Sequence, residues 1–136
     1  MDIPKLLQDR TCGFTKIILT RTYGNDLGAA VSALGLPVSP ADLQSMTPVE
    51  AQTALSRLFS RDLAYGKEVM GAETAQAYAR AIITEYARPG SHIYTNAQWE
   101  DESLSTFTPV TPSTFNVVVL ITNTDFAVSF LIEDED

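Results

Sequence analysis

The last third of the chain holds the stretch that most constrains the fold: two apolar runs separated by three polar residues. The runs span Phe115 to Thr122 and Phe126 to Ile132, and both are rich in β-branched and aromatic residues. With Asn123-Thr124-Asp125 as the connection, they predict an antiparallel β-hairpin. The first run is apolar on both faces, so we expect it at the sheet centre with helices packed over it. The second alternates more cleanly, which favours a position nearer an edge.

Helix signals are concentrated in the middle of the chain. Thr47-Pro48-Val49-Glu50 combines an N-cap, a proline at the first helical position and a capping-box glutamate, and predicts a helix from Pro48 to about Asp62. Ser39-Pro40-Ala41-Asp42 carries a similar helix start. The apolar spacing over Ala72 to Ala87 predicts a longer helix, which Arg88-Pro89-Gly90 ends.

The remaining elements are shorter. We expect helices over residues 3 to 9 and from Asn25 or Asp26 to Gly35, and strands over Phe14 to Tyr23 and Ser91 to Asn96. The prolines of Phe107 to Pro112 favour an extended linker into the hairpin.

The order of these elements predicts an α+β fold, with a mixed or antiparallel sheet whose C-terminal hairpin packs against the middle group of helices. A chain of 136 residues with 45% apolar content is expected to form a single domain over residues 1–136. The acidic C-terminal end at 133–136 closes it.

Cellular location is predicted from what the sequence lacks. It has no apolar run of membrane-spanning length and no N-terminal signal-peptide pattern, so we expect a cytoplasmic protein. The lone Cys12 excludes an internal disulfide and fits a reducing compartment.

Charge is distributed unevenly along the chain. The formal net charge is −8, and residues 1–88 contain nine acids and nine Lys or Arg residues, whereas residues 89–136 contain eight acids and neither cation. This asymmetry argues against direct binding to nucleic-acid phosphates or to an anionic membrane surface, which needs clustered cations. It favours a basic partner protein. The alternative is that the acids keep an apolar hairpin soluble.

Catalytic and metal-binding patterns are sparse. A Cys–His nucleophile pair would have to join Cys12 to His92, and no local motif links them. The run Glu133-Asp134-Glu135-Asp136 lacks the alternating ligands and turn glycine of a calcium loop, and we interpret it as a solvated acidic tail. We therefore expect no enzyme activity, no metal and no cofactor.

An aromatic residue beside three acids is the most suggestive functional feature. Tryptophan is a favoured interface anchor, and carboxylates steer a basic partner. We predict one partner-binding face formed by Tyr94, Trp99, Glu100, Asp101, Glu102, Glu133, Asp134, Glu135 and Asp136. The alternative places Trp99 at the rim of the core, with the acids marking a loop.

Three hypotheses about function follow. The first is a small acidic protein that binds and inhibits a basic partner such as a toxin or nuclease, as a bacterial immunity protein does. The second is a structural or assembly subunit that forms homo-oligomers through the open edge of the C-terminal hairpin. The third is a small-molecule-binding domain or an enzyme with a pocket that the linear sequence does not reveal.

Overall fold

The computed structural model describes residues 3–10, 14–21, 26–36, 38–63, 67–100, 103–107 and 115–134. Its centre is a five-stranded antiparallel sheet in the order β1-β7-β6-β3-β2. The strands of this sheet are β1 (Phe14–Arg21), β2 (Gln44–Met46), β3 (His92–Thr95), β6 (Phe115–Thr122) and β7 (Phe126–Asp134). A separate two-stranded sheet pairs β4 (Ala97–Glu100) with β5 (Ser103–Phe107). The predicted α+β fold with a C-terminal hairpin is confirmed.

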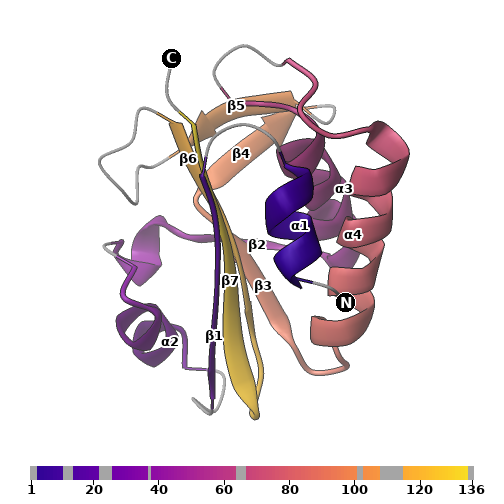
Figure 1. Cartoon of the computed structure of the whole chain (residues 1–136). Coiled ribbons are helices and arrows are strands. Elements are labelled where there is room, and N and C mark those ends of the chain that lie inside the picture. Colours follow the sequence, from indigo (N-terminus) through magenta and orange to yellow (C-terminus); the bar gives the residue numbers. More distant parts are fainter. Residues whose placement is uncertain are drawn as a thin grey trace.

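Helices cover both faces of the main sheet. Figure 1 views the sheet along its edge and shows helices on either side of it. The first side holds α1 (Ile3–Asp9), α3 (Pro48–Ser60) and α4 (Ala72–Tyr86), and the second holds α2 (Leu27–Leu34) and the 3-10 helix η1 (Pro40–Asp42). No helix in these described ranges is long and apolar enough to cross a membrane.

The hairpin occupies the middle of the sheet, as the sequence predicted. The strand β6 is third of five, and each residue from Val117 to Ile121 is fully buried. The strand β7 lies between β6 and the edge strand β1, one place closer to an edge. Both strands of the hairpin therefore have a neighbour on each side, with β1 along β7 and β3 along part of β6.

Alternation along β6 and β7 divides the core into two clusters. The larger cluster lies under α1, α3 and α4; from the hairpin it takes Val117, Val119, Ile121, Phe126, Val128, Phe130 and Ile132. The smaller cluster lies under α2, and from the hairpin it takes Val118, Leu120, Ala127 and Leu131. Burial on both faces removes the aggregation hazard that this apolar stretch would otherwise present.

Local signals set most helix ends. The capping box is present at α3, where the Glu50 backbone N–H donates to Thr47 Oγ1 at 3.1 Å and the Thr47 N–H donates to Glu50 Oε1 at 2.9 Å. Asp26 caps α2, and Gly35 ends it with a left-handed φ of 70° that favours glycine.

The second predicted helix start does not lead to a long helix. Ser39 caps only η1, a single turn, because Leu43 adopts an extended conformation and directs the chain into β2. The Leu43 side chain packs into the smaller core cluster, and Gln44–Met46 pairs with β3. Tertiary packing thus outweighs the local helix signal at this point.

Candidate functional site: an acidic two-stranded ribbon

The predicted aromatic and acidic segment begins where the chain leaves the main sheet. The strand β3 pairs with β6 from His92 to Thr95, and β4 then pairs with β5 instead. Asn96 sits at this junction and is buried. Its side-chain amide donates to the Asn116 carbonyl at 3.0 Å, and its oxygen accepts from the Val118 N–H at 2.9 Å. These bonds give the Asn116 carbonyl and the Val118 N–H partners where the pairing with β3 ends, so both groups stay hydrogen-bonded as β4 diverges.

The strands β4 and β5 form a ribbon, which we call the acidic ribbon (residues 97–107). In its register Trp99 lies opposite Leu104 and Glu100 lies opposite Ser103, with a β-bulge between Gln98 and Trp99. The structure gives the backbone course of Trp99 and Glu100 but not their side chains, while Asp101 and Glu102 lie outside the described residues. Ala97, at the start of the ribbon, is buried in the larger core cluster, so the ribbon is anchored to the core at that end.

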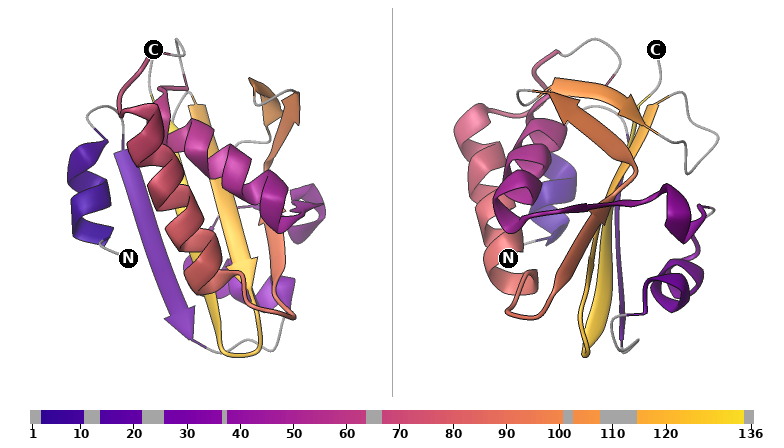
Figure 2. Two further views of the ribbon diagram at one scale, coloured as in Figure 1. Left: turned by 90° about the vertical axis from the view of Figure 1, so that its right-hand side faces the viewer. Right: turned by 180° about the vertical axis from the view of Figure 1, so that it is seen from behind.

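The end of the last strand lies at the same end of the molecule as the ribbon. Figures 1 and 2 show the ribbon, the start of β6 and the end of β7 together at the top in all three views. Glu133 lies there and is partly buried, while Glu135 and Asp136 are outside the described residues. Two parts of the predicted acidic face thus gather at one end of the fold, although they are far apart in sequence.

Tyr94 has a different environment from the ribbon. It lies on β3 opposite Leu120 and is partly buried against the smaller core cluster under α2. Its ring is tilted against the ring of His92, with 6.4 Å between the ring centroids. Tyr94 therefore contributes to packing on that face of the sheet.

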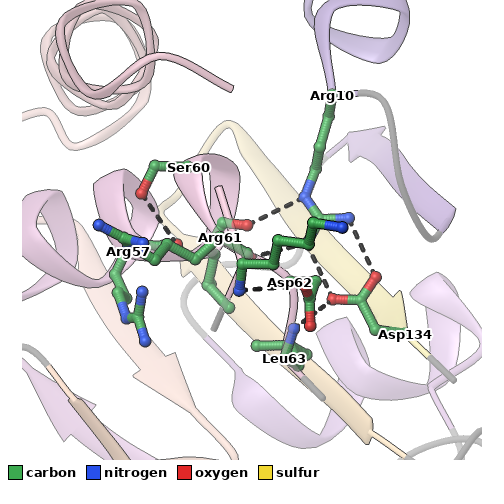
Figure 3. A network of polar contacts seen from close by, with 9 residues as sticks. Arg10, Arg57, Ser60, Arg61, Asp62, Leu63 and Asp134 are labelled. Carbon is green, nitrogen blue, oxygen red and sulfur yellow. Dashed lines mark hydrogen bonds and ion pairs between the residues drawn. The ribbon is translucent and has the colours of Figure 1, made fainter. Parts of the chain in front are cut away.

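The interpretation of Asp134 as part of a solvated tail is wrong. The strand β7 continues to Asp134, whose carboxylate meets the Arg10 guanidinium at 3.1 and 2.9 Å, and both side chains are at most 1% exposed. The same carboxylate accepts from the Leu63 N–H at 2.7 Å. Figure 3 shows these bonds between β7, the end of α1 and the chain after α3. Asp134 is thus a buried structural residue, and a partner cannot reach it in this fold.

A second acid of the last third also faces a cation. Asp125 Oδ2 lies 3.4 Å from Arg88 Nη1 at the turn of the hairpin, where both side chains are exposed. Arg88 also lies over the Phe126 ring, 5.0 Å from its centroid. With Asp125 and Asp134 both paired to cations from the first 88 residues, the charge available for a partner shifts towards the ribbon and the chain end.

The described part of the chain offers no assembled catalytic or metal site. His92 is exposed on β3, and Cys12 lies outside the described residues, so the proposed pair is not tested. No group of three or more potential metal ligands comes together among the residues with known placement.

Glu50 shows the clearest local electrostatic effect in the described chain. Its backbone and side-chain hydrogen bonds with Thr47 lower the pKa of the carboxyl, which serves the helix cap. This shift has a structural cause, and Glu50 is far from the ribbon in the sequence.

Comparison with known proteins gives no relative. No protein-family model matches the chain, and neither the curated proteins nor the solved structures contain a match. The functional argument therefore depends on the site alone.

Sequence reasoning did not identify Asn96 or the pairing of β4 with β5. The run from Ser91 to Asn96 predicted a strand, and β3 confirms it over His92–Thr95. The sequence signal for this junction was an asparagine at the end of the predicted strand. Its side chain supplies both a donor and an acceptor, so it can bond the backbone of a neighbouring strand.

Proposed function

We propose that this chain is a cytoplasmic protein-binding domain that recognises a basic partner protein through the acidic ribbon and acts as its inhibitor. The supporting observation is the divergence of β4 and β5 from the main sheet, which places the backbone of Trp99 and Glu100 on a separate ribbon; Asp101 and Glu102 follow them in the sequence. Acidic residues of the acidic ribbon would attract a cationic surface towards the aromatic Trp99. Inhibition by occlusion needs no catalytic group, so the function of a bacterial immunity protein against a toxin or nuclease fits this site.

The alternative of self-assembly through the hairpin loses its main support. Its premise was an open edge on the hairpin, and β7 is paired with β1 along its length. On the other side β3 pairs with the second half of β6, and Asn96 satisfies part of the first half. We therefore favour the binder of a basic protein.

The test is a tagged pull-down from the lysate of the source organism at low and high salt, with bound proteins identified by mass spectrometry. We expect a stoichiometric basic protein that high salt releases, because screening weakens exposed charge pairs. The variant E100K/D101K/E102K should lose this protein.

The control variant must change net charge equally at another place. Asp42, Glu73 and Glu85 are exposed acids of η1 and α4, so D42K/E73K/E85K is suitable. Retention by this control, with loss by the ribbon variant, supports a local binding face. Equal loss in both variants, or unchanged binding in the ribbon variant, would refute it.

A further inference from the structure

The strand β1 forms an open edge of the main sheet. It pairs with β7 on one side, from Phe14 opposite Glu133 to Arg21 opposite Phe126, and it has no strand on the other side among the described residues. Figure 1 looks onto this edge, and no described helix or strand crosses β1 in that view; Figure 2 shows α1 reaching out beyond the edge beside one part of β1. Half of the backbone N–H and C=O groups of an edge strand point away from the sheet, so β1 presents a row of unfilled hydrogen-bonding positions.

The edge strand carries apolar side chains that are not fully buried. Leu19 on β1 is 54% exposed and Leu7 on α1 is 42% exposed, and they are two of the three large apolar residues that the described chain leaves exposed. Leu19 lies on the edge strand itself, and α1, which carries Leu7, packs beside that strand. Ile17 and Ile18 are only partly buried. Together with these two isoleucines, Leu19 gives the open edge an apolar contact for an added strand.

The charge of β1 restricts what can occupy the edge. Lys16 and Arg21 are exposed, and the strand contains no acid. A second copy of β1 would bring four cations and no acid into one pair of strands, where like charges oppose pairing. A strand with acids opposite Lys16 and Arg21 would instead form two cross-strand charge pairs.

We propose that the β1 edge binds an extended acidic segment of another protein, which adds to the main sheet as a sixth strand. Main-chain hydrogen bonds provide affinity in this mode, and alternate side chains provide specificity. This surface differs in position and in sign of charge from the acidic ribbon, so the inference does not depend on the proposed function.

The register defines the segment. Lys16 and Arg21 are five positions apart and therefore face opposite sides of the sheet. The added strand needs two acids with the same separation, at the first and sixth positions of a hexapeptide. When the added strand runs antiparallel to β1, its first position lies opposite Arg21 and its sixth opposite Lys16. Its third and fifth positions then lie opposite Leu19 and Ile17 and should be apolar, as in Glu-Thr-Val-Thr-Val-Glu.

The test is selection from a display library of random decapeptides, with the full chain as bait. We expect enrichment of sequences with two acids five positions apart and β-branched residues between them. Selected peptides should weaken about tenfold on K16E/R21E and on L19D, because these changes reverse the charge pairs or place an acid in the apolar contact. They should keep their affinity for K67E/R80E, which reverses two exposed cations outside β1.

Two further measurements separate the possible outcomes. Peptide binding should slow hydrogen exchange of the β1 amides. N-methylation of the alternate peptide residues whose N–H groups face β1 should abolish binding, because it removes the main-chain donors. A contact through side chains alone would tolerate this change. The ribbon variant E100K/D101K/E102K should bind the peptides normally, so failure of one proposal leaves the other intact.

The proposal is overturned by any of four results. These are a selection without enrichment, selected peptides that are basic, unchanged affinity for K16E/R21E, and a homodimer in sedimentation that L19D dissociates. The last result would assign the edge to a second copy. Leu19 is exposed, so L19D should fold, and its far-ultraviolet circular dichroism verifies this before binding is measured.

Discussion

The Arg10 guanidinium and the Asp134 carboxylate, 124 positions apart in the sequence, form two buried hydrogen bonds of 3.1 and 2.9 Å. Arg10 also donates to the carbonyls of Leu58 and Arg61, at 3.0 and 3.1 Å. The Asp134 carboxylate accepts in addition from the Leu63 N–H. One ion pair thus connects the residue after α1, the C-terminal end of α3 and the end of β7.

The first prediction concerns this pair. Asp134→Asn should reduce the free energy of unfolding by about 3 kcal/mol, because it removes the carboxylate charge that faces the buried Arg10 guanidinium. Urea denaturation at neutral pH measures the loss. Glu133→Gln is the matched control, since it removes the same charge from the neighbouring, partly buried position and should cost less than about 1 kcal/mol. Equal effects of the two substitutions would show that the ion pair contributes little to stability.

The burial of Asp134 was available from the pattern of the last strand. Phe126, Val128, Phe130 and Ile132 alternate onto one face, and the next position in that phase is 134. The four consecutive acids of residues 133–136 suggested a solvated tail. We gave this acidic composition more weight than the two-residue alternation of the strand. The partner was not available, because no local signal connects Arg10 to a residue at the other end of the chain.

The other outcomes follow the same division between local and long-range information. The capping box of Thr47 and Glu50 and the apolar runs of the hairpin act over a few residues, and both predicted their elements correctly. The strands β2, β4 and β5 were missed, since each is short and exists through its pairing with another strand. For the candidate site, the sequence located the acids and Trp99, and pairing between strands determined that Trp99 and Glu100 lie on a ribbon.

The second prediction concerns the bend between β3 and β4. Asn96→Ala should reduce the free energy of unfolding by about 2 kcal/mol, because two buried backbone groups of β6 lose their partner. The Val118 amide should also exchange faster with solvent than that of its neighbour Val119, whose N–H points to the other side of β6, towards β7, where Val119 lies opposite Phe130. Hydrogen exchange followed by NMR measures both amides. Ser45→Ala on exposed β2 serves as control, and an unchanged Val118 amide in the Asn96 variant would contradict this role.

The third prediction uses two threonines of α3 and its cap. Thr47→Ala should cost about 1 kcal/mol, since it removes the oxygen that accepts from the Glu50 N–H. Thr53→Ala in the helix interior should be neutral or stabilising by about 0.5 kcal/mol, because alanine has the higher helix propensity. Chemical denaturation of both variants measures the difference. Destabilisation of similar size at both positions would show that the cap has no special role.

The fourth prediction concerns pH and Glu50. Hydrogen bonds from Thr47 lower the pKa of Glu50 below its ordinary 4.5, so its contribution to stability is present above pH 4.5 and is lost as the pH falls through the lowered pKa. Glu50→Gln keeps an oxygen that accepts the Thr47 N–H and removes the titration. The variant should therefore lose less stability than the unchanged chain between pH 7 and pH 3. Parallel acid profiles for the two proteins would contradict this assignment.

The fifth prediction concerns Tyr86, which is buried under the hairpin. Its ring meets those of Phe126 and Phe130 edge to face, with centroids 5.6 and 5.9 Å away. Burial first, and the nearby Glu85 charge second, raise the pKa of Tyr86 above its ordinary 10.0. The neutral phenol is thus favoured in the folded chain, so stability is retained below pH 10 and lost as the pH rises through the raised pKa.

Tyr86→Phe keeps the ring contacts and removes this titration. Its free energy of unfolding should therefore fall less steeply above pH 10 than that of the unchanged chain. The difference in phenolate absorbance between the two folded proteins reports the titration of Tyr86 without the other four tyrosines of the chain. Glu85→Gln removes the smaller of the two causes and should leave most of the shift. A midpoint at or below 10.0 for Tyr86 would show that water reaches the phenol and that the end of α4 packs more loosely over β7 than the structure has it.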